Sequence, residues 1–310
     1  MEIGLDVGYG MTKAISSDGQ VKTFRSIVGI GTPDMLGIAH RNALAVQINN
    51  DRYTIGEDAE KYKLPLINVR KRNSIESIAY KALILAAIGD IPEELNIVTG
   101  LPLDFYSTDK ERISRVFTGL FPGSQITIIP QPAGSFFDML LNSDGNIAND
   151  EYAKKKIGII DIGTYTTDLL LLEKADPIKE LSSTITIGID TLIRNIVKDC
   201  AHIRRNLPQK DIENALKTGT LSKHGQQIDI SDTVSRNRAA VARNIWSYVN
   251  SVWGAEDDIE ELILTGGGAT VFRDAFVQSN ITSPSAPFMS NVYGFYKLAR
   301  RIGHGSKVQA

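Results

Sequence analysis

Short apolar runs separated by tight turn signals open the chain. Gly-rich or Ser-Asp-Gly turns separate the first three runs, which predicts an antiparallel meander of three strands. Asn49-Asn50-Asp51 lies between two further runs and predicts a hairpin. The expected strands are 2–6, 12–16, 21–27, 43–48 and 52–55, with a loop over 29–37.

Longer segments carry apolar residues at the three-to-four-residue spacing of amphipathic helices. The expected helices are 75–88, 104–117, 132–141, 189–200, 209–217, 233–252, 270–278 and 292–302. Compact apolar runs between them predict buried strands at 96–101, 125–129, 157–161, 168–173 and 259–264. This mixture of strands and helices predicts an α/β fold.

The opening pattern returns halfway along the chain. Residues 4–12 align with residues 159–167 at an offset of 155 residues, the separation of Asp6 from Asp161. Both copies read Asp-x-Gly-x-x-x-Thr between two strands. Two copies of one unit predict a duplicated two-domain α/β protein, with the polar segment 142–156 as its linker.

The repeated turn has the composition of an anion site. Glycines let successive backbone N–H groups face outward and form a cradle for phosphate. Asp6 and Asp161 each end a buried strand, where a cation would offset the cost of burying a carboxylate. Mg²⁺ bound to a polyphosphate fits this chemistry. One copy alone is better interpreted as an ordinary β-turn, and the repetition reverses that preference.

Three other places carry candidate chemistry. Lys13 follows the first turn and is either a point charge for phosphate or a surface lysine. Gln131 either orients a water molecule or simply begins a helix. Gly266-Gly267-Gly268 either lets an adenine or a phosphate approach the backbone or makes a tight strand-to-helix turn.

Composition excludes several other classes of protein. The 34 basic and 36 acidic residues give a net charge of −2, which argues against a generally basic nucleic-acid-binding protein. The single cysteine, Cys200, excludes an intrachain disulfide, and the four histidines lack zinc-site spacing. No leader pattern and no apolar run long enough to span a membrane are present, so we expect a cytoplasmic location.

Five motifs in order resemble those of the superfamily that contains actin, sugar kinases and heat-shock chaperone ATPases. They are similar to its first phosphate, first connecting, second phosphate, adenosine and second connecting motifs. These are residues 6–13, 131–133, 161–168, 265–269 and 291–296, respectively. The resemblance implies a duplicated actin-like (ribonuclease H-like) fold with a nucleotide in the cleft between the domains.

Less specific motifs indicate a particular group within this superfamily. Gly100-Leu101-Pro102, residues 186–190 and residues 291–297 resemble the plasmid-segregation actins of the ParM/StbA group and their archaeal relatives. Tyr9 and Tyr165 depart from the pattern, because small polar residues are common at these turn positions. The implied domains are 1–142 plus 291–310, with a small insertion over about 29–90, and 143–290.

The resemblance also implies a set of site residues for ATP or GTP and Mg²⁺. Gln131 and Asp161 would be catalytic, and Asp6 and Asp161 would hold Mg²⁺, partly through water. The implied phosphate-binding residues are Gly8, Tyr9, Gly10, Met11, Thr12, Lys13, Gly163, Thr164, Tyr165 and Thr166. The implied adenosine-binding residues are Gly188, Gly266, Gly267 and Gly268.

The function expected from this resemblance is ATP hydrolysis coupled to head-to-tail filament formation, in plasmid DNA segregation or a related cytoskeletal role. A DNA-binding adaptor is an expected partner, whereas direct contact with nucleic acid or membrane is not. A small-molecule kinase is one alternative, which Gln131 disfavours because it suits water better than an acceptor alcohol. A nucleotide-binding scaffold at a membrane is another, if residues 295–302 form a membrane-targeting helix and not a packed closing helix.

Overall fold

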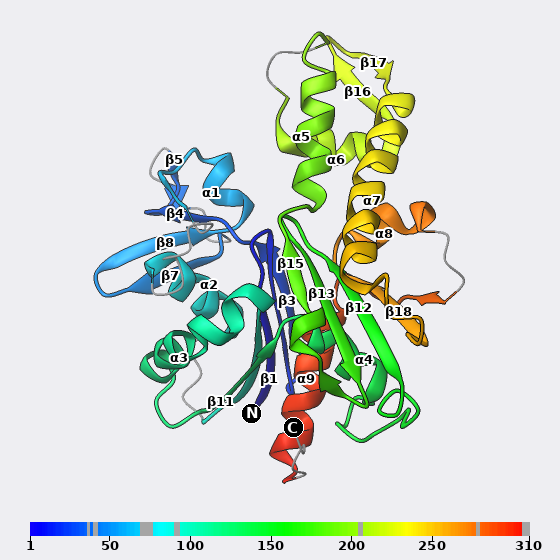
Figure 1. The fold of residues 1–310 in the computed structure, drawn as a ribbon. Coiled ribbons are helices and arrows are strands. Elements are labelled where there is room, and N and C mark those ends of the chain that lie inside the picture. Colours follow the sequence, from blue (N-terminus) through cyan, green and yellow to red (C-terminus); the bar gives the residue numbers. More distant parts are fainter. Residues whose placement is uncertain are drawn as a thin grey trace. The chain divides into compact units, whose positions relative to one another are not determined.

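A computed structural model describes residues 1–35, 38–39, 43–68, 77–89, 94–203, 207–276 and 280–305. Contacts divide the chain into two compact units. Unit 1 comprises residues 1–155, 173–176 and 289–310, and unit 2 comprises residues 156–172 and 177–288. Each unit combines a mixed sheet with helices, as the α/β expectation requires (Figure 1).

Unit 1 is built on a five-stranded sheet in the order β11-β10-β1-β2-β3. The first three strands of the chain pair antiparallel, which confirms the meander, and β10 and β11 add to it in parallel. The strands are β1 (Glu2–Val7), β2 (Met11–Ser16), β3 (Val21–Arg25), β10 (Asn96–Leu101) and β11 (Gln125–Pro130).

Helices cover both faces of this sheet, because neighbouring strand residues point to opposite sides. Ile97 of β10 packs with α2 (Ile78–Ile88) and α3 (Leu103–Leu120). Val98 packs instead with Phe295 and Leu298 of α9 (Ser290–Gly303), which lies beside α4 (Ala133–Leu140). The apolar face of α9 is therefore buried, so this segment is a packed closing helix.

An insertion between β3 and α2 forms a small sheet of its own, in the order β7-β8-β4-β9. Its elements are β4 (Val28–Ile30), β7 (Ala45–Ile48), β8 (Asp51–Ile55), α1 (Glu57–Lys61) and β9 (Leu66–Ile67), beside the separate pair β5 (Asp34–Met35) and β6 (Ile38–Ala39). The hairpin of β7 and β8 confirms the expectation. The loop expected over 29–37 was wrong at residues 29–30, which belong to β4 with strands paired on both sides, and at residues 34–35, which form β5. Residues 36–37 lie outside the described residues.

Unit 2 has a six-stranded sheet in the order β14-β13-β12-β18-β19, with β15 paired to β13. Its two central strands, β12 and β18, are parallel. The strands are β12 (Lys156–Ile162), β13 (Thr167–Glu173), β14 (Asp176–Pro177), β15 (Ser183–Ile185), β18 (Glu261–Thr265) and β19 (Ile281–Thr282).

The helices of unit 2 bury one large apolar core that includes Ile160, Ile196, Ile245 and Trp253. They are α5 (Ile189–Asp199), α6 (Gln209–Thr218), α7 (Ser231–Trp253) and α8 (Ala269–Phe272), with 3₁₀ turns at Lys179–Leu181 and Arg273–Ala275. The helix expected over 270–278 is shorter, since α8 ends at Phe272. The hairpin of β16 (Thr220–Lys223) and β17 (Gln226–Asp229) was not predicted.

The division by contacts differs from the boundaries expected at residues 142 and 291. Residues 142–155 stay with unit 1, because Leu141 pairs with Ile147 and the Gly145 carbonyl accepts a hydrogen bond from Arg301 of α9 at 3.2 Å. The polar composition of residues 142–155 therefore belongs to a surface segment of unit 1. In the described part of the chain, none of the helices has the length and apolarity that a membrane span requires.

Candidate functional site

The two copies of the repeated turn have the same hydrogen bond. In unit 1 the Gly8 N–H donates to the Met11 carbonyl at 3.1 Å, and in unit 2 the Gly163 N–H donates to the Thr166 carbonyl at 2.8 Å. Each bond closes a tight connection between two buried strands. The sequence repeat is thus also a repeat in backbone structure.

Asp6 is the centre of a buried polar group in unit 1. It lies directly across the β1–β2 ladder from Lys13, whose Nζ is 3.0 Å from Asp6 Oδ2. Gln131 donates from Nε2 to Asp6 Oδ1 at 2.8 Å. Asp6 is only 1% exposed, so Lys13 supplies the countercharge that a buried carboxylate needs. The structure thus brings Gln131 beside two predicted site residues that lie far from it in sequence.

Gln131 is held in place by its backbone as well. Its N–H donates to the Leu101 carbonyl at 2.7 Å, and α4 begins just after it. A Cβ on Gly100 would lie 2.8 Å from Gln131 Cα and would overlap Phe295, so only glycine fits beneath Gln131. Sequence analysis gave Gly100 no steric role, although a glycine inside a buried strand is a signal of close approach.

The helices that carry the two connecting motifs cross at two glycines. A Cβ on Gly294 of α9 would overlap the carbonyl of Gly134 in α4. Beside this crossing, the Ser135 hydroxyl hydrogen-bonds to Asn291 Oδ1 at 2.7 Å, and both residues are buried. The crossing fixes the direction of α4, and hence of Gln131 at its start.

Asp138 completes the seam between α4 and α9, and sequence analysis missed it. Its carboxylate accepts hydrogen bonds from Ser290 Oγ at 2.7 Å and from Lys297 Nζ at 2.6 Å. Lys297 also donates to the Asp138 carbonyl at 2.7 Å. Charge-assisted bonds of this kind are stronger than neutral ones, so they tie the second connecting motif firmly to the first.

Threonine hydroxyls of the turns bond to protein groups in this structure. Thr12 Oγ1 is 2.9 Å from Ser26 Oγ, and Ser26 in turn donates to the Gly8 carbonyl. In unit 2, Thr166 Oγ1 donates to Asp168 at 3.4 Å and Thr167 Oγ1 donates to the Ile187 carbonyl at 2.7 Å. These contacts hold the hydroxyl groups in place within the turns.

The position that matches Lys13 in the second turn is Asp168. Its side chain is buried and accepts hydrogen bonds from the Thr184 and Thr166 hydroxyls. The second turn therefore has two buried carboxylates, Asp161 and Asp168, where the first has a carboxylate and an ammonium. The cradles share their backbone and differ in charge.

Three of the four glycines assigned to adenosine are required by packing within unit 2. A Cβ on Gly266, where φ is +83°, would overlap Asp161, and one on Gly268 would overlap Ile162. A Cβ on Gly188 would lie 2.7 Å from the Gly163 carbonyl. The adenosine motif is thus packed against the second phosphate turn.

Gly267 is different, because a Cβ there would meet only ordinary contacts. It would lie 3.5 Å from Ile189 Cδ1 and 3.6 Å from Phe288 Cδ2. Gly267 is partly exposed, as are these two apolar side chains. Of the four glycines, Gly267 is the one whose surface is open to a flat ligand.

The carboxylates fit Mg²⁺ unequally. In the part of the chain that the structure describes, no group of three or more His, Cys, Asp or Glu side chains surrounds a metal-sized site. Mg²⁺ bound to a nucleotide takes most of its ligands from phosphate and water, so one carboxylate such as Asp161 is a suitable donor. Both oxygens of Asp6 already accept hydrogen bonds, which leaves it suited to contact through water.

Two tyrosines, Tyr9 and Tyr80, lie near Asp6 at the first turn. Burial raises the pKa of the Tyr80 phenol, and the nearby Asp6 carboxylate and Tyr9 raise it further. Tyr80 lies on α2 and was not predicted as a neighbour of the site. It stays neutral at physiological pH and adds no charge beside Asp6.

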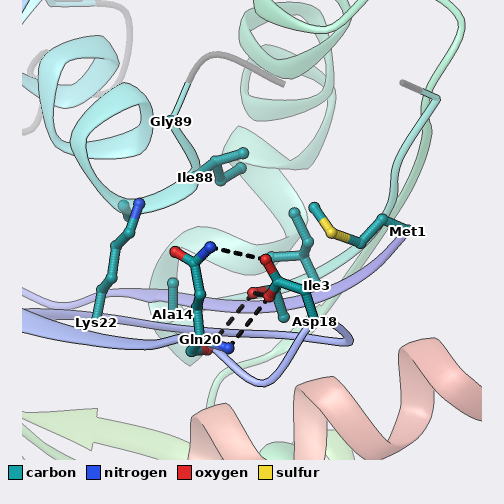
Figure 2. A pocket seen from close by; sticks show the side chains of 10 residues that line it. Met1, Ile3, Ala14, Asp18, Gln20, Lys22, Ile88 and Gly89 are labelled. Carbon is teal, nitrogen blue, oxygen red and sulfur yellow. Dashed lines mark hydrogen bonds between the residues drawn. The ribbon is translucent and has the colours of Figure 1, made fainter. Parts of the chain in front are cut away.

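A separate cavity of about 500 Å³ lies in unit 1 between the sheet and the end of α2. Figure 2 shows Ile3, Ala14 and Ile88 at its apolar walls and Lys22 and Gln20 at its polar side. None of the predicted site residues lines it. The candidate site is therefore defined by the turns and not by this cavity.

Two family models match the chain on either side of its midpoint. The model for the N-terminal domain of actin-like proteins matches residues 4–134, and the model for the C-terminal domain of archaeal MreB-like actin homologues matches residues 159–278. Each match contains one copy of the repeated turn. The two matches identify an actin-like domain in each half of the chain.

Relatives cover nearly the whole chain. An archaeal actin homolog of Thermoplasma volcanium is 26% identical over 299 residues. The match covers 88% of this chain and 89% of the homolog. A ParM from a 15-stranded filament of Clostridium botulinum has a TM-score of 0.75 at 22% identity and covers 97% of this chain and 99% of its own.

An archaeal actin homolog solved in complex with ADP has a TM-score of 0.74 at 20% identity, covering 97% of this chain and 99% of its own. At these identities the structural likenesses establish the fold. The actin-like fold expected from the five motifs is confirmed.

Proposed function

We propose that this actin-like chain is a filament-forming ATPase that binds ATP or GTP with Mg²⁺. The observation that carries the proposal is the joining of Asp6, Lys13 and Gln131 at the first turn, with the same backbone turn repeated beside Asp161. A structural helix start needs no buried carboxylate at its glutamine, whereas a fixed partner for the amide suits a site that orients water.

Residues 8–13 and 163–166 of the two turns are the proposed phosphate contacts. The N–H groups of Gly8 and Gly163 already donate within the turns, so other groups of these residues would reach the phosphate. Gly267 is the proposed contact for the base, since its surface is open. The archaeal homolog solved with ADP supports a nucleotide as ligand, although that complex is a property of the relative. Asp161 is the proposed Mg²⁺ carboxylate, with Asp6 acting through water. Bound Mg²⁺ would supply charge stabilisation at the phosphates.

Gln131 is proposed to orient the attacking water. An amide is too weak a base to remove a proton at neutral pH, so its part is hydrogen bonding. Lys13 and the backbone cradles would stabilise the negative charge that develops on the phosphate. Asp161 would help to hold the water.

Self-association is proposed from the likeness to a protein solved as a filament. A head-to-tail contact that does not close on itself generates a filament. We propose that nucleotide binding favours the conformation of the chain that assembles. The cellular role proposed is plasmid DNA segregation or a related cytoskeletal task in the cytoplasm, with an adaptor protein as the link to DNA.

The test combines light scattering, phosphate release and negative-stain microscopy with ATP, GTP or ADP, each with Mg²⁺ or with EDTA. We expect filaments above a threshold protein concentration with Mg²⁺ and a triphosphate, and phosphate release that follows assembly. Hydrolysis without assembly at high concentration would contradict the filament. Nucleotide consumption only after an acceptor alcohol is added would point to a kinase, and binding to liposomes without assembly would point to a scaffold.

A further inference from the structure

We infer that Asp6 is a positioning residue that sets the orientation of the Gln131 amide. The inference rests on the proposed hydrolysis and assigns Asp6 a part in it that is distinct from holding metal. Three observations carry it: the hydrogen bond between the two side chains, the ion pair with Lys13, and the restraint on the Gln131 backbone.

The hydrogen bond decides which end of the amide faces Asp6. An ionised carboxylate only accepts hydrogen bonds, so the group 2.8 Å from Asp6 Oδ1 must be the Gln131 NH₂. The opposite orientation would place the amide oxygen against a carboxylate oxygen, two acceptors in a buried site. Asp6 therefore turns Gln131 Oε1 away from itself.

This orientation is the one that a hydrolytic water requires. A water attacks phosphorus through a lone pair, and its protons must point to an acceptor. Gln131 Oε1 is such an acceptor, whereas a reversed amide would donate to the lone pair that must attack. Holding the NH₂ end thus selects the productive amide orientation before nucleotide binds, which is the general advantage of preorganised polar groups.

Lys13 supplies the countercharge of Asp6. Its ammonium lies 3.0 Å from Oδ2, the oxygen that Gln131 does not use, and both side chains are buried. Charge-assisted hydrogen bonds to a carboxylate are stronger than neutral ones. The two contacts divide the oxygens of Asp6 between them.

The backbone of Gln131 is fixed independently of Asp6. The N–H bond to Leu101 and the close contact with Gly100 hold Cα. The end of the side chain would still rotate about its own bonds. Among the described residues, Asp6 hydrogen-bonds to that end, so the Gln131 side chain is restrained both at its backbone and at its amide.

A double-mutant cycle separates this role from a metal role. Asp6→Asn, Gln131→Ala and the double variant are compared with wild type in single-turnover phosphate release and in nucleotide affinity. Asp109→Asn is the control, because Asp109 is a buried carboxylate of α3 that pairs with Arg112 and has no part in the proposed site. We expect Asp6→Asn to slow hydrolysis by about 10²-fold with affinity within about threefold, because one oriented contact is lost. The double variant should be no slower than Gln131→Ala. Multiplied effects in the double variant, or an unchanged rate in Asp6→Asn, would overturn the inference.

A second readout needs no hydrolysis and works on the nucleotide-free protein. The side-chain NH₂ resonances of Gln131, assigned by their loss in Gln131→Ala, should show one proton shifted downfield by the carboxylate bond. That shift should collapse in Asp6→Asn. Resonances at ordinary glutamine positions in wild type would overturn the inference even if Asp6→Asn fails to fold. A wild type with the shift but no hydrolysis would instead contradict the proposed function alone.

Discussion

The two turns of the repeat have the same backbone hydrogen bond and different electrostatics. Gly8 and Gly163 make equivalent hydrogen bonds, yet Lys13 in the first turn is replaced by Asp168 in the second. The first turn neutralises its own aspartate and holds an amide with the remaining oxygen. The second concentrates acidic groups and orders them with hydroxyls.

The comparison teaches that duplication preserves what the backbone does and leaves side-chain roles free to diverge. A cradle of N–H groups depends on glycine and on strand pairing, both of which survive in each copy. The turn forms with either sign of charge at the seventh residue after the aspartate, Lys13 or Asp168. In the proposed function, one copy positions a water and the other attracts a cation.

The largest expected effect follows from removing the acid of the second turn. Asp161→Ala should abolish measurable phosphate release, at least about 10³-fold, because Asp161 is the proposed Mg²⁺ carboxylate. Its thermal melting should stay cooperative, which a calorimetric scan checks. Turnover at the wild-type rate would show that the second turn is only a structural copy of the first.

Removing the amide of the first turn should have a smaller effect. Gln131→Ala should bind ATP nearly normally but hydrolyse it about 10²-fold more slowly, since one oriented polar contact is lost. Any filaments should last longer, because disassembly waits on hydrolysis. Phosphate release, nucleotide affinity and filament lifetime are compared with wild type. Weaker binding with an unchanged rate per bound nucleotide would reduce Gln131 to a helix-start residue.

The glycines of unit 2 offer a matched pair of substitutions. Gly267→Ala should leave the melting temperature unchanged, because its Cβ meets only ordinary contacts, while lowering nucleotide affinity by about tenfold, or ~1.4 kcal/mol. Gly266→Ala should destabilise the fold through its positive φ and its overlap with Asp161. Thermal melts and titrations with a fluorescent nucleotide check both. Full affinity in Gly267→Ala would exclude the open surface as a base contact.

The smallest expected effects come from removing a hydroxyl group that hydrogen-bonds in each turn. Thr184→Val removes a donor from the buried Asp168 carboxylate and should cost about 2 kcal/mol of unfolding free energy. Ser26→Ala removes a donor to the neutral Gly8 carbonyl and should cost about 1 kcal/mol. Denaturant titrations measure both. Equal losses would mean that the charge difference between the turns has no bearing on stability.

The sequence predicted the architecture because its strongest signals were local or repeated. The offset of 155 residues between Asp6 and Asp161 indicated duplication, and apolar periodicity located most helices and strands. The short strand β4 was missed, because burial of Val28 depends on α2, which lies far along the chain.

The sequence supplied candidate residues for the site and did not show how they contact one another. No sequence pattern shows that Lys13 pairs with Asp6, that Asp6 holds Gln131, or that Asp138 joins Lys297. These contacts join distant segments through sheet register and helix crossing. The packing glycines show the same limit, since Gly266 and Gly267 are neighbours in sequence and differ in what surrounds them.

The placement of α9 has a consequence for how the chain is made. Unit 2 comes from one stretch of sequence apart from the β13–β14 connection, whereas unit 1 closes only when residues 289–305 are available. During synthesis, the face of its sheet around Val98 stays uncovered until Phe295 and Leu298 arrive. The half that begins first is thus completed last, and premature termination before α9 would release a product with a finished second half and an open first one.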